Sequence, residues 1–320
     1  MKRPPIPFHL PVESSEPSHA NSPSRPVLLI NANSGGGKSL RAAVAERARE
    51  RGVEVVVLSN GQSLRETARA AAAGGADVLG VAGGDGSLAV VASVAIEHGL
   101  PFVCVPAGTR NHFALDVGVD RRDVIGALDA FYEGVERLID VAEVNGLMFL
   151  NNTSMGIYGD AVRRSAYRDA KLRTLLETAD EALLPGAEVP GLRLIDDLGR
   201  DHRHLGLVLV SNNPYALNSP PVHGTRPGLD TGRLGTIIVG VPGESTRLVA
   251  RAWTATHVEI SADAPVHAGV DGEAVTLSPP LRFTVRPRVL RVLISPSHPG
   301  ASALIPGRPR EPWRQDGRAG

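Results

Sequence analysis

The chain has 320 residues, of which 42% are hydrophobic and 21% charged, so it is long enough for one large or two medium-sized domains with cores of their own. It contains 34 Lys and Arg residues and 34 Asp and Glu residues, and this balance excludes recruitment of nucleic acid or an anionic membrane by overall charge. The single cysteine, Cys104, excludes a disulfide framework and a cysteine metal cluster and is typical of a reducing, cytoplasmic compartment.

The first half of the chain alternates between short apolar runs and helical patterns. Residues 1–25 are rich in proline and predict a disordered tail. Strands are then expected at 27–30, 53–58, 76–81 and 102–105, and helices at 38–51, 63–73 and 87–98. This order predicts an α/β domain over residues 26–136, built on a doubly wound parallel sheet. Ligands of such sheets bind outside the carboxyl ends of the strands.

The pattern becomes β-rich from residue 137 onward. Strands are expected at 137–144, 148–150, 205–210, 236–241, 257–260, 265–270, 281–285 and 289–294, and helices at 166–184 and 245–252. These segments predict a second domain over residues 137–295 with an antiparallel, sandwich-like sheet, whose last strand is a candidate to return to the first domain. Residues 296–320 are rich in proline and arginine and predict a second tail.

The most informative motif is a glycine loop between the third predicted strand and its helix. It reads Gly83-Gly84-Asp85-Gly86-Ser87. Backbone N–H groups without side chains at the start of a helix can hold phosphate, and Asp85 is the one group of the loop that can handle a proton or a metal ion. The alternative is an ordinary Asp-Gly turn.

Two further loops follow strands of the same predicted sheet. The first predicts an anion-binding loop with these candidate contacts: Asn31, Ser34, Gly35, Gly36, Gly37 and Lys38. It falls short of a Walker P-loop because Ala32 stands where that motif has glycine. The other loop offers donors from Gly108, Thr109 and Asn111 to a nucleotide. The alternative for that loop is a turn and helix cap.

Together these loops resemble the diacylglycerol kinase catalytic-domain family, whose relatives include sphingosine kinases and, more distantly, NAD kinases. The family's Gly-Gly-Asp-Gly-Thr resembles residues 83–87, its Asn-Pro-x-Ser-Gly resembles 31–35, and its Pro-x-Gly-Thr-Gly-Asn-Asp-Phe-Ala resembles 106–114. Arg110 and His112 depart from the last motif, where the family has glycine and aspartate. Residues 149–156 and Val270-Asp271-Gly272-Glu273 extend the resemblance, which covers nearly all of residues 26–295 and implies two domains with ATP in the cleft.

The resemblance implies an ATP- and Mg²⁺-dependent lipid kinase of phospholipid biosynthesis, which phosphorylates a hydroxyl group of a diacylglycerol-like or sphingoid-like lipid. It points to Asp271 as the general base, to Glu273 as a support for that base or for the metal, and to Asp85 as the organiser of Mg²⁺ and phosphates. The relation to sphingosine kinases nominates Asp85 as the base instead. A hairpin turn with solvated acids is the alternative for residues 271–273.

A supporting Mg²⁺ site is expected at Asp230. The family's Asp-Gly-x-Leu-Asp run resembles residues 230–235, although Gly235 stands where the family has its final aspartate. Asp230 is therefore the candidate metal ligand, and a structural turn is the alternative.

A basic amphipathic segment suggests how the protein would meet a lipid. Its cations are Arg163, Arg164, Arg168, Lys171 and Arg173, interleaved with leucines at helical spacing. Such a segment can rest on the inner face of an anionic membrane, and the alternative is a helix that packs on its own domain. Two other functions stay open: an NAD kinase-like or other soluble-alcohol kinase, and a nucleotide-binding module without catalysis.

Overall fold

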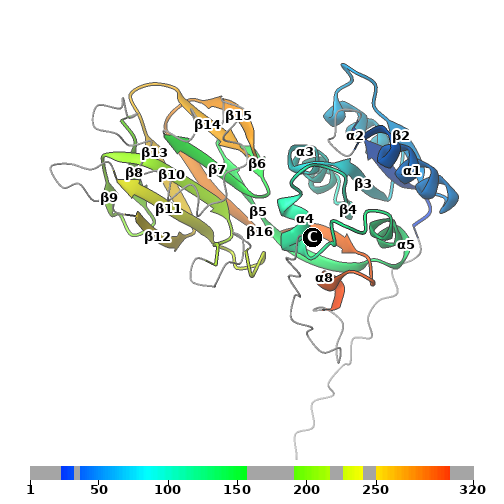
Figure 1. The fold of residues 1–320 in the computed structure, drawn as a ribbon. Helices are drawn as coiled ribbons and strands as arrows, with labels where there is room; N and C mark the ends of the chain where they lie inside the picture. The colour runs from blue at the N-terminus through cyan, green and yellow to red at the C-terminus, as the bar shows by residue number, and fades with distance from the viewer. Residues whose placement is uncertain (1–22, 32–36, 157–190, 217–225, 241–249, 303–320) are drawn as a thin grey trace, which may run out of the picture.

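A computed structural model describes residues 23–31, 37–156, 191–216, 226–240 and 250–302. Two lobes lie side by side, an α/β lobe that contains the N-terminal elements and a β-rich lobe (Figure 1). Within the described residues, no helix is long and apolar enough to span a membrane.

The α/β lobe is built on parallel strands in the order β2-β1-β3-β4. The strands are β1 (Pro26–Ile30), β2 (Glu54–Val57), β3 (Val78–Gly83) and β4 (Phe102–Pro106). The helices are α1 (Gly37–Glu50), α2 (Leu64–Ala73), α3 (Asp85–Glu97), α4 (His112–Val117), the short 3₁₀ helix η1 (Gly126–Asp129) and α5 (Ala130–Glu133). The hydroxyl group of Ser63 accepts the N–H of Glu66 and so caps α2. The predicted parallel sheet is confirmed.

Two long antiparallel strands, β5 (Val135–Val144) and β16 (Leu281–Ile294), join the lobes. The end of β16 also pairs in parallel with β4. Each strand serves two cores: Val141 and Leu290 pack in the α/β lobe, whereas Val144 and Phe283 pack in the β-rich lobe. The large sheet therefore continues across the predicted domain boundary at residue 137. The two strands predicted at 281–285 and 289–294 are one strand with a register shift.

The β-rich lobe consists of two packed layers. The large sheet contributes β6 (Leu147–Phe149), β8 (Arg193–Asp196), β9 (Asp201–His202) and β13 (His257–Ser261) besides β5 and β16. The second sheet is antiparallel, with β7 (Asn152–Gly156), β10 (Leu205–Asn212), β11 (Leu234–Gly240), β12 (Ala250–Ala255), β14 (Val266–Val270) and β15 (Glu273–Leu277). Side chains from both layers form one core, in which the rings of Phe149 and Phe283 meet edge to face. The predicted antiparallel, sandwich-like second half is confirmed.

Two expectations need correction. Residues 250–252, expected in a helix, lie in strand β12, because pairing with β11 prevails over their helix propensity. The C-terminal tail does not begin at residue 296: the segment to residue 302 packs on the α/β lobe, where His298 and Ala301 are buried and α8 (Pro299–Ser302) forms. The remaining parts of the two tails, the helix expected at 166–184 and the basic segment at 163–173 lie outside the described residues.

Asp140, on β5, holds the junction between the lobes together. Its side chain is fully buried, and its two carboxylate oxygens accept N–H groups from Gly232 at 2.7 Å and Arg288 at 2.9 Å. An asparagine at this position has one accepting oxygen and would leave one buried N–H unpaired. We expect Asp140→Asn to lower the free energy of unfolding by about 1–3 kcal/mol, measured by chemical denaturation.

Glu136→Gln on the same strand is the matched control for this prediction. Glu136 pairs with Arg291 at the surface, where both side chains are about 40% exposed. We expect this control to cost at most about 1 kcal/mol. An equal loss in the two variants would contradict the role given to Asp140.

Candidate active site

The three predicted loops meet at one rim of the parallel sheet. In the strand register, Ile30 of β1 lies beside Ala82 of β3, and Gly83 lies beside Pro106 of β4, so the three strands end together. The side-chain amide of Asn31 donates a hydrogen bond to the hydroxyl group of Ser87 at 2.9 Å. The start of the first loop is thereby tied to the glycine loop.

The glycine loop and the third loop touch through their backbones. A Cβ atom added to Gly108 would lie 2.3 Å from the Cα of Gly84, closer than real Cβ contacts. The third loop is closed by Asn111, which is buried in the left-handed conformation with φ 53°. Its amide group accepts the N–H of Gly108 at 3.0 Å and donates to the carbonyl of the same residue at 2.9 Å. The Asn111 side chain thus shapes the loop that was expected to contact a nucleotide.

The N-terminus of α3 presents backbone N–H groups at this rim. The N-cap residue Gly84 makes no side-chain cap, and the first helical hydrogen bond is made by the N–H of Leu88. The carboxylate of Asp85 turns instead to α4, where it accepts the N–H groups of His112 at 3.1 Å and Phe113 at 3.0 Å. Asp85 therefore caps the short helix of the third loop.

The structure describes only some of the remaining residues that were predicted to contact the nucleotide at the rim. Gly37 has φ 77° at the start of α1, and Lys38 and Thr109 are exposed. Ser34, Gly35 and Gly36 lie outside the described residues. Their roles in nucleotide binding stay predictions.

The second segment predicted to be catalytic is the hairpin between β14 and β15. Asp271 and Gly272 form its turn with φ values of 48° and 85°. The Asp271 carboxylate reaches back and accepts three backbone N–H groups, from Leu150 at 2.8 Å, Asn151 at 2.7 Å and Asn152 at 3.2 Å. The segment is a hairpin, as one alternative held, but Asp271 is not a solvated surface acid.

The surroundings of Asp271 change its acidity. Loss of water raises the pKa of its carboxyl group to about 7, and the charge of Asp85 adds to the rise. The hydrogen bonds from Leu150 and Asn151 and the charge of Arg226 act in the opposite direction. A carboxyl group with a pKa near 7 can take up and release protons under physiological conditions.

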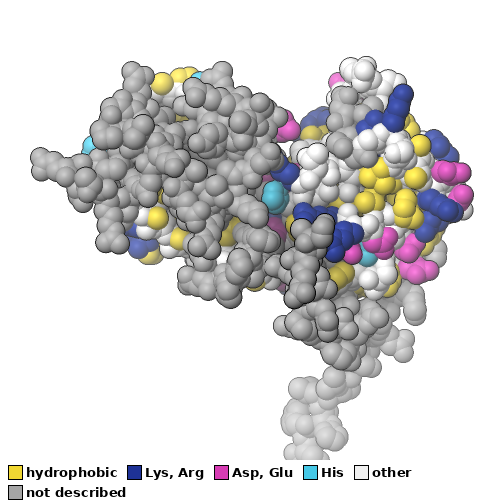
Figure 2. Space-filling model, in the orientation of Figure 1, with side chains coloured by type: hydrophobic (Ala, Val, Ile, Leu, Met, Phe, Trp, Pro, Cys, Tyr) yellow, Lys and Arg dark blue, Asp and Glu magenta, His cyan; other side chains and the backbone are white. Residues whose placement is uncertain are grey.

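Glu273 brings the hairpin to the glycine loop. A Cβ atom added to Gly86 would lie 3.2 Å from Oε1 of Glu273 and 3.3 Å from its Cγ. Residues of both lobes therefore meet at the glycine loop. In the space-filling view, basic side chains and a histidine gather where the two lobes meet (Figure 2).

Asp230, the predicted metal ligand, is exposed and interacts with Arg137. Burial lowers the pKa of Arg137, and the charge of Asp230 acts against that shift. Gly235 has no room for the aspartate of the family motif, because a Cβ there would lie 2.5 Å from the hydroxyl oxygen of Ser211. Among the described residues, no group of three or more His, Cys, Asp or Glu side chains is placed to hold a metal ion.

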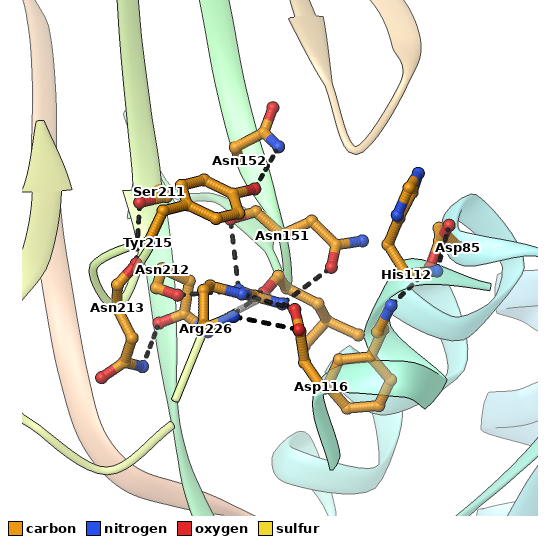
Figure 3. A network of polar contacts seen from close by, with 12 residues as sticks. Asp85, His112, Asp116, Asn151, Asn152, Ser211, Asn212, Asn213, Tyr215 and Arg226 are labelled. Atoms are coloured by element: carbon orange, nitrogen blue, oxygen red, sulfur yellow. Dashed lines mark hydrogen bonds and ion pairs between the residues drawn. The ribbon is translucent and has the colours of Figure 1, made fainter. Parts of the chain in front are cut away.

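Figure 3 shows a buried polar network that no sequence motif indicated, and it shares residues 150 and 151 with the hydrogen bonds of Asp271. Its centre is Arg226, which pairs with Asp116 of α4 at 2.6 Å and lies against the ring of Tyr215. The hydroxyl group of Tyr215 accepts a hydrogen bond from the side-chain amide of Asn152 at 2.8 Å. The spacing of these residues in the sequence matches no known motif. The one feature of the sequence that could have indicated the network is the run of polar residues 211–213 at the end of an apolar strand.

Known proteins that are similar to this chain show the family to which it belongs. The family model "Diacylglycerol kinase catalytic domain" matches residues 25–144. A Pseudomonas aeruginosa protein named "Probable lipid kinase YegS-like" is 30% identical over 319 residues, with 91% of this chain and 98% of that protein covered. The chain belongs to the diacylglycerol kinase catalytic-domain family.

Other relatives share parts of the chain or its fold. A Mycobacterium tuberculosis diacylglycerol kinase is 32% identical over 122 residues, which is 37% of this chain and 40% of that protein. A solved structure of a diacylglycerol kinase from Bacillus anthracis has a TM-score of 0.61 at 16% identity and covers 87% of this chain and 99% of its own. A second structure from that organism has a TM-score of 0.67 at 18% identity, with the same coverage. The fold of this chain is thus similar to the folds of these two solved structures.

Proposed function

We propose that the protein transfers the γ-phosphate of ATP to a hydroxyl group of a diacylglycerol-like or sphingoid-like lipid. Membership of a family of lipid kinases supports the reaction class. The observation that carries the proposal is the Asp271 carboxyl group, which has a pKa of about 7 and lies at the junction of the lobes beside the charge of Asp85. A base of that pKa suits the removal of a proton from an alcohol near neutral pH.

The hydrogen bonds of Asp271 leave room for one substrate contact. An ionised carboxylate has about four acceptor positions. Among the described residues, Oδ1 accepts from Asn151 and Asn152, and Oδ2 accepts only from Leu150. The free position on Oδ2 would accept the proton of the substrate hydroxyl group. The hydroxyl oxygen of the substrate would then form a bond to the γ-phosphorus, while the bond between the γ-phosphorus and the oxygen that bridges it to the β-phosphate breaks. ADP leaves with that electron pair, and the proton stays on Asp271.

The rim would bind the phosphates. The first-turn N–H groups of α3 and the close glycine backbones of residues 84 and 108 suit negatively charged oxygens, and Lys38 adds a cation at the start of α1. In-line transfer of the phosphoryl group depends mainly on the positioning of the phosphates and the stabilisation of their charge, and the protein needs to form no covalent bond.

The residues present fit a magnesium ion that arrives with the nucleotide. Each carboxylate oxygen of Asp85 accepts one N–H group and keeps acceptor capacity, so Asp85 would hold the ion at the rim. Mg²⁺ in such sites is bound by one or two carboxylates, water and substrate phosphates, which agrees with the lack of a three-residue cage among the described residues. When bound, the ion would neutralise charge on the phosphate oxygens.

The test is transfer of label from γ-³²P-ATP in the presence of Mg²⁺. The acceptors are diacylglycerol and sphingosine in mixed micelles and, as a soluble alternative, NAD. We expect labelled lipid and unlabelled NAD. Labelled NAD would favour the soluble-alcohol kinase, and ATP binding without transfer to any acceptor would favour a module without catalysis.

A further inference from the structure

Arg226 is a fully buried cation with partners from both lobes. It pairs with Asp116 of α4, to which its Nε donates at 2.7 Å, and its guanidinium group donates to the carbonyl groups of Leu150 and of Asn212, the latter at 2.7 Å. A further N–H donates to the side-chain oxygen of Asn151 at 2.8 Å. Its planar fork of donors meets all of these acceptors, which the single ammonium group of a lysine would not reach together.

The same short segment holds Asp271. Leu150 and Asn151 present oxygens to Arg226, and residues 150–152 direct their backbone N–H groups at the Asp271 carboxylate. Arg226 and Asp271 therefore bind different groups of the same segment, residues 150–152: Arg226 binds oxygens and Asp271 binds N–H groups. A displacement of Arg226 would move the N–H groups that orient the Asp271 oxygens.

A second path leads from Arg226 to the rim. Its partner Asp116 lies on α4, and the first turn of α4 is capped by Asp85 from the glycine loop. Figure 3 shows Asp85 and His112 to the right of Arg226 and Asn151 and Asn152 above it. The chain of contacts thus connects the phosphate rim of one lobe to the carboxylate of the other.

We propose that Arg226 is a positioning residue, which fixes the Asp271 carboxylate relative to the phosphate-binding rim through Asp116 on one side and the turn 150–152 on the other. This inference rests on the proposed role of Asp271. A purely structural ion pair would hold the fold equally well without affecting the base, so the test must measure the base itself.

The experiment compares Arg226→Gln, Arg226→Lys and Asp116→Asn with the wild type. The titratable and charged groups that face Asp271 are Asp85, Arg226 and the neutral phenol of Tyr215, with Glu273 two residues away. We expect a decrease in kcat of about 100-fold in Arg226→Gln, because misplacement by about 1 Å has that effect, whereas the KM for ATP stays unchanged because Arg226 does not contact the rim.

Arg226→Lys separates position from charge, because removal of the Arg226 charge alone already raises the pKa of Asp271. Loss of the cation in Arg226→Gln raises this pKa, whereas Asp116→Asn leaves the cation less neutralised and lowers it. Arg226→Lys keeps the charge, so it lowers kcat with little change of the pKa. The pKa is measured from the pH dependence of kcat/KM and, without any activity, by NMR titration of the Asp271 carboxyl carbon, assigned with Asp271→Asn.

Arg291→Gln is the control, because Arg291 pairs with Glu136 at the surface of β16. A folded Arg226→Gln protein with wild-type kcat and an unshifted Asp271 pKa would overturn the inference. If Arg226→Gln does not unfold cooperatively, the inference is tested with Arg226→Lys and Asp116→Asn instead. A wild-type kcat in both of these variants would also overturn the inference. If the wild type phosphorylates no lipid, the proposed function fails, and the NMR titration still decides whether Arg226 controls Asp271.

Discussion

Replacement of Asp271 by asparagine is expected to lower kcat for lipid phosphorylation by about 10²- to 10⁴-fold, the usual contribution of a general base. The amide cannot accept the proton of the substrate, and its NH₂ group would face one or more of the N–H groups that Leu150, Asn151 and Asn152 direct at the carboxylate. The measurement is initial rate against ATP and lipid concentration, with cooperative thermal unfolding as the check of folding.

The pH dependence separates a base from a structural anchor. The base works unprotonated, so kcat/KM of the wild type rises with pH through about 7 and levels off above it, because burial raises the pKa of Asp271 to about 7. The residual rate of Asp271→Asn loses this inflection. Glu136→Gln, which removes an exposed carboxylate, keeps both the rate and the profile. A wild-type profile without an inflection near pH 7 would favour Asp85 as the base.

The rim of the sheet was predictable because local patterns determine it. Apolar runs followed by glycine and polar residues predict that loops begin at residues 31, 83 and 106, directly after strands. The carboxyl ends of parallel strands lie at one edge of the sheet, so these loops come together there. The structure places the first loop's Asn31 against Ser87 and Gly84 against Gly108, as that reasoning required. The division of roles between Asp85 and Asp271 stays a prediction.

The sequence around Asp271 does not predict the environment of its carboxyl group. An Asp-Gly pair in a hairpin is ordinarily exposed, but the N–H groups that hold its carboxylate come from residues about 120 positions earlier in the chain. Arg226 and Asp116 are 110 positions apart and belong to no spacing pattern. Contacts of this kind arise from the path of β5 and β16 between the lobes, which the alternation of strands and helices does not encode.

Strand β12 shows the same limit for secondary structure. Its alanine and arginine residues favour a helix in isolation, and the extended conformation of residues 250–255 follows from their register with Leu234–Val239 of β11. The segment after β16 was expected to be a tail because of its prolines. It packs instead because Gly118 and Gly300 allow two backbones to approach, with an N–H to carbonyl distance of 2.9 Å.

The second large effect is expected from a single methyl group at the rim. In Gly108→Ala, the added Cβ would lie 2.3 Å from the Cα and 2.8 Å from the nitrogen of Gly84, so two backbones must separate. In Gly84→Ala, the added Cβ meets the Cα of Gly108 at 3.6 Å, an ordinary contact, and residue 84 has an extended backbone that alanine adopts without strain. The same substitution in the two touching loops therefore has unequal consequences.

We expect Gly108→Ala to lower the free energy of unfolding by about 1–3 kcal/mol, as other overpacked sites do, and Gly84→Ala to change it by no more than about 0.5 kcal/mol. Separation of the loops also moves Asn111 and the first turn of α4, so Gly108→Ala should weaken ATP binding by about tenfold or more, measured by calorimetry at saturating Mg²⁺. Equal stability of the two variants, with ATP affinity unchanged in Gly108→Ala, would show that the two loops do not need this contact. The nucleotide would then have to bind elsewhere than at the rim formed by residues 84 and 108.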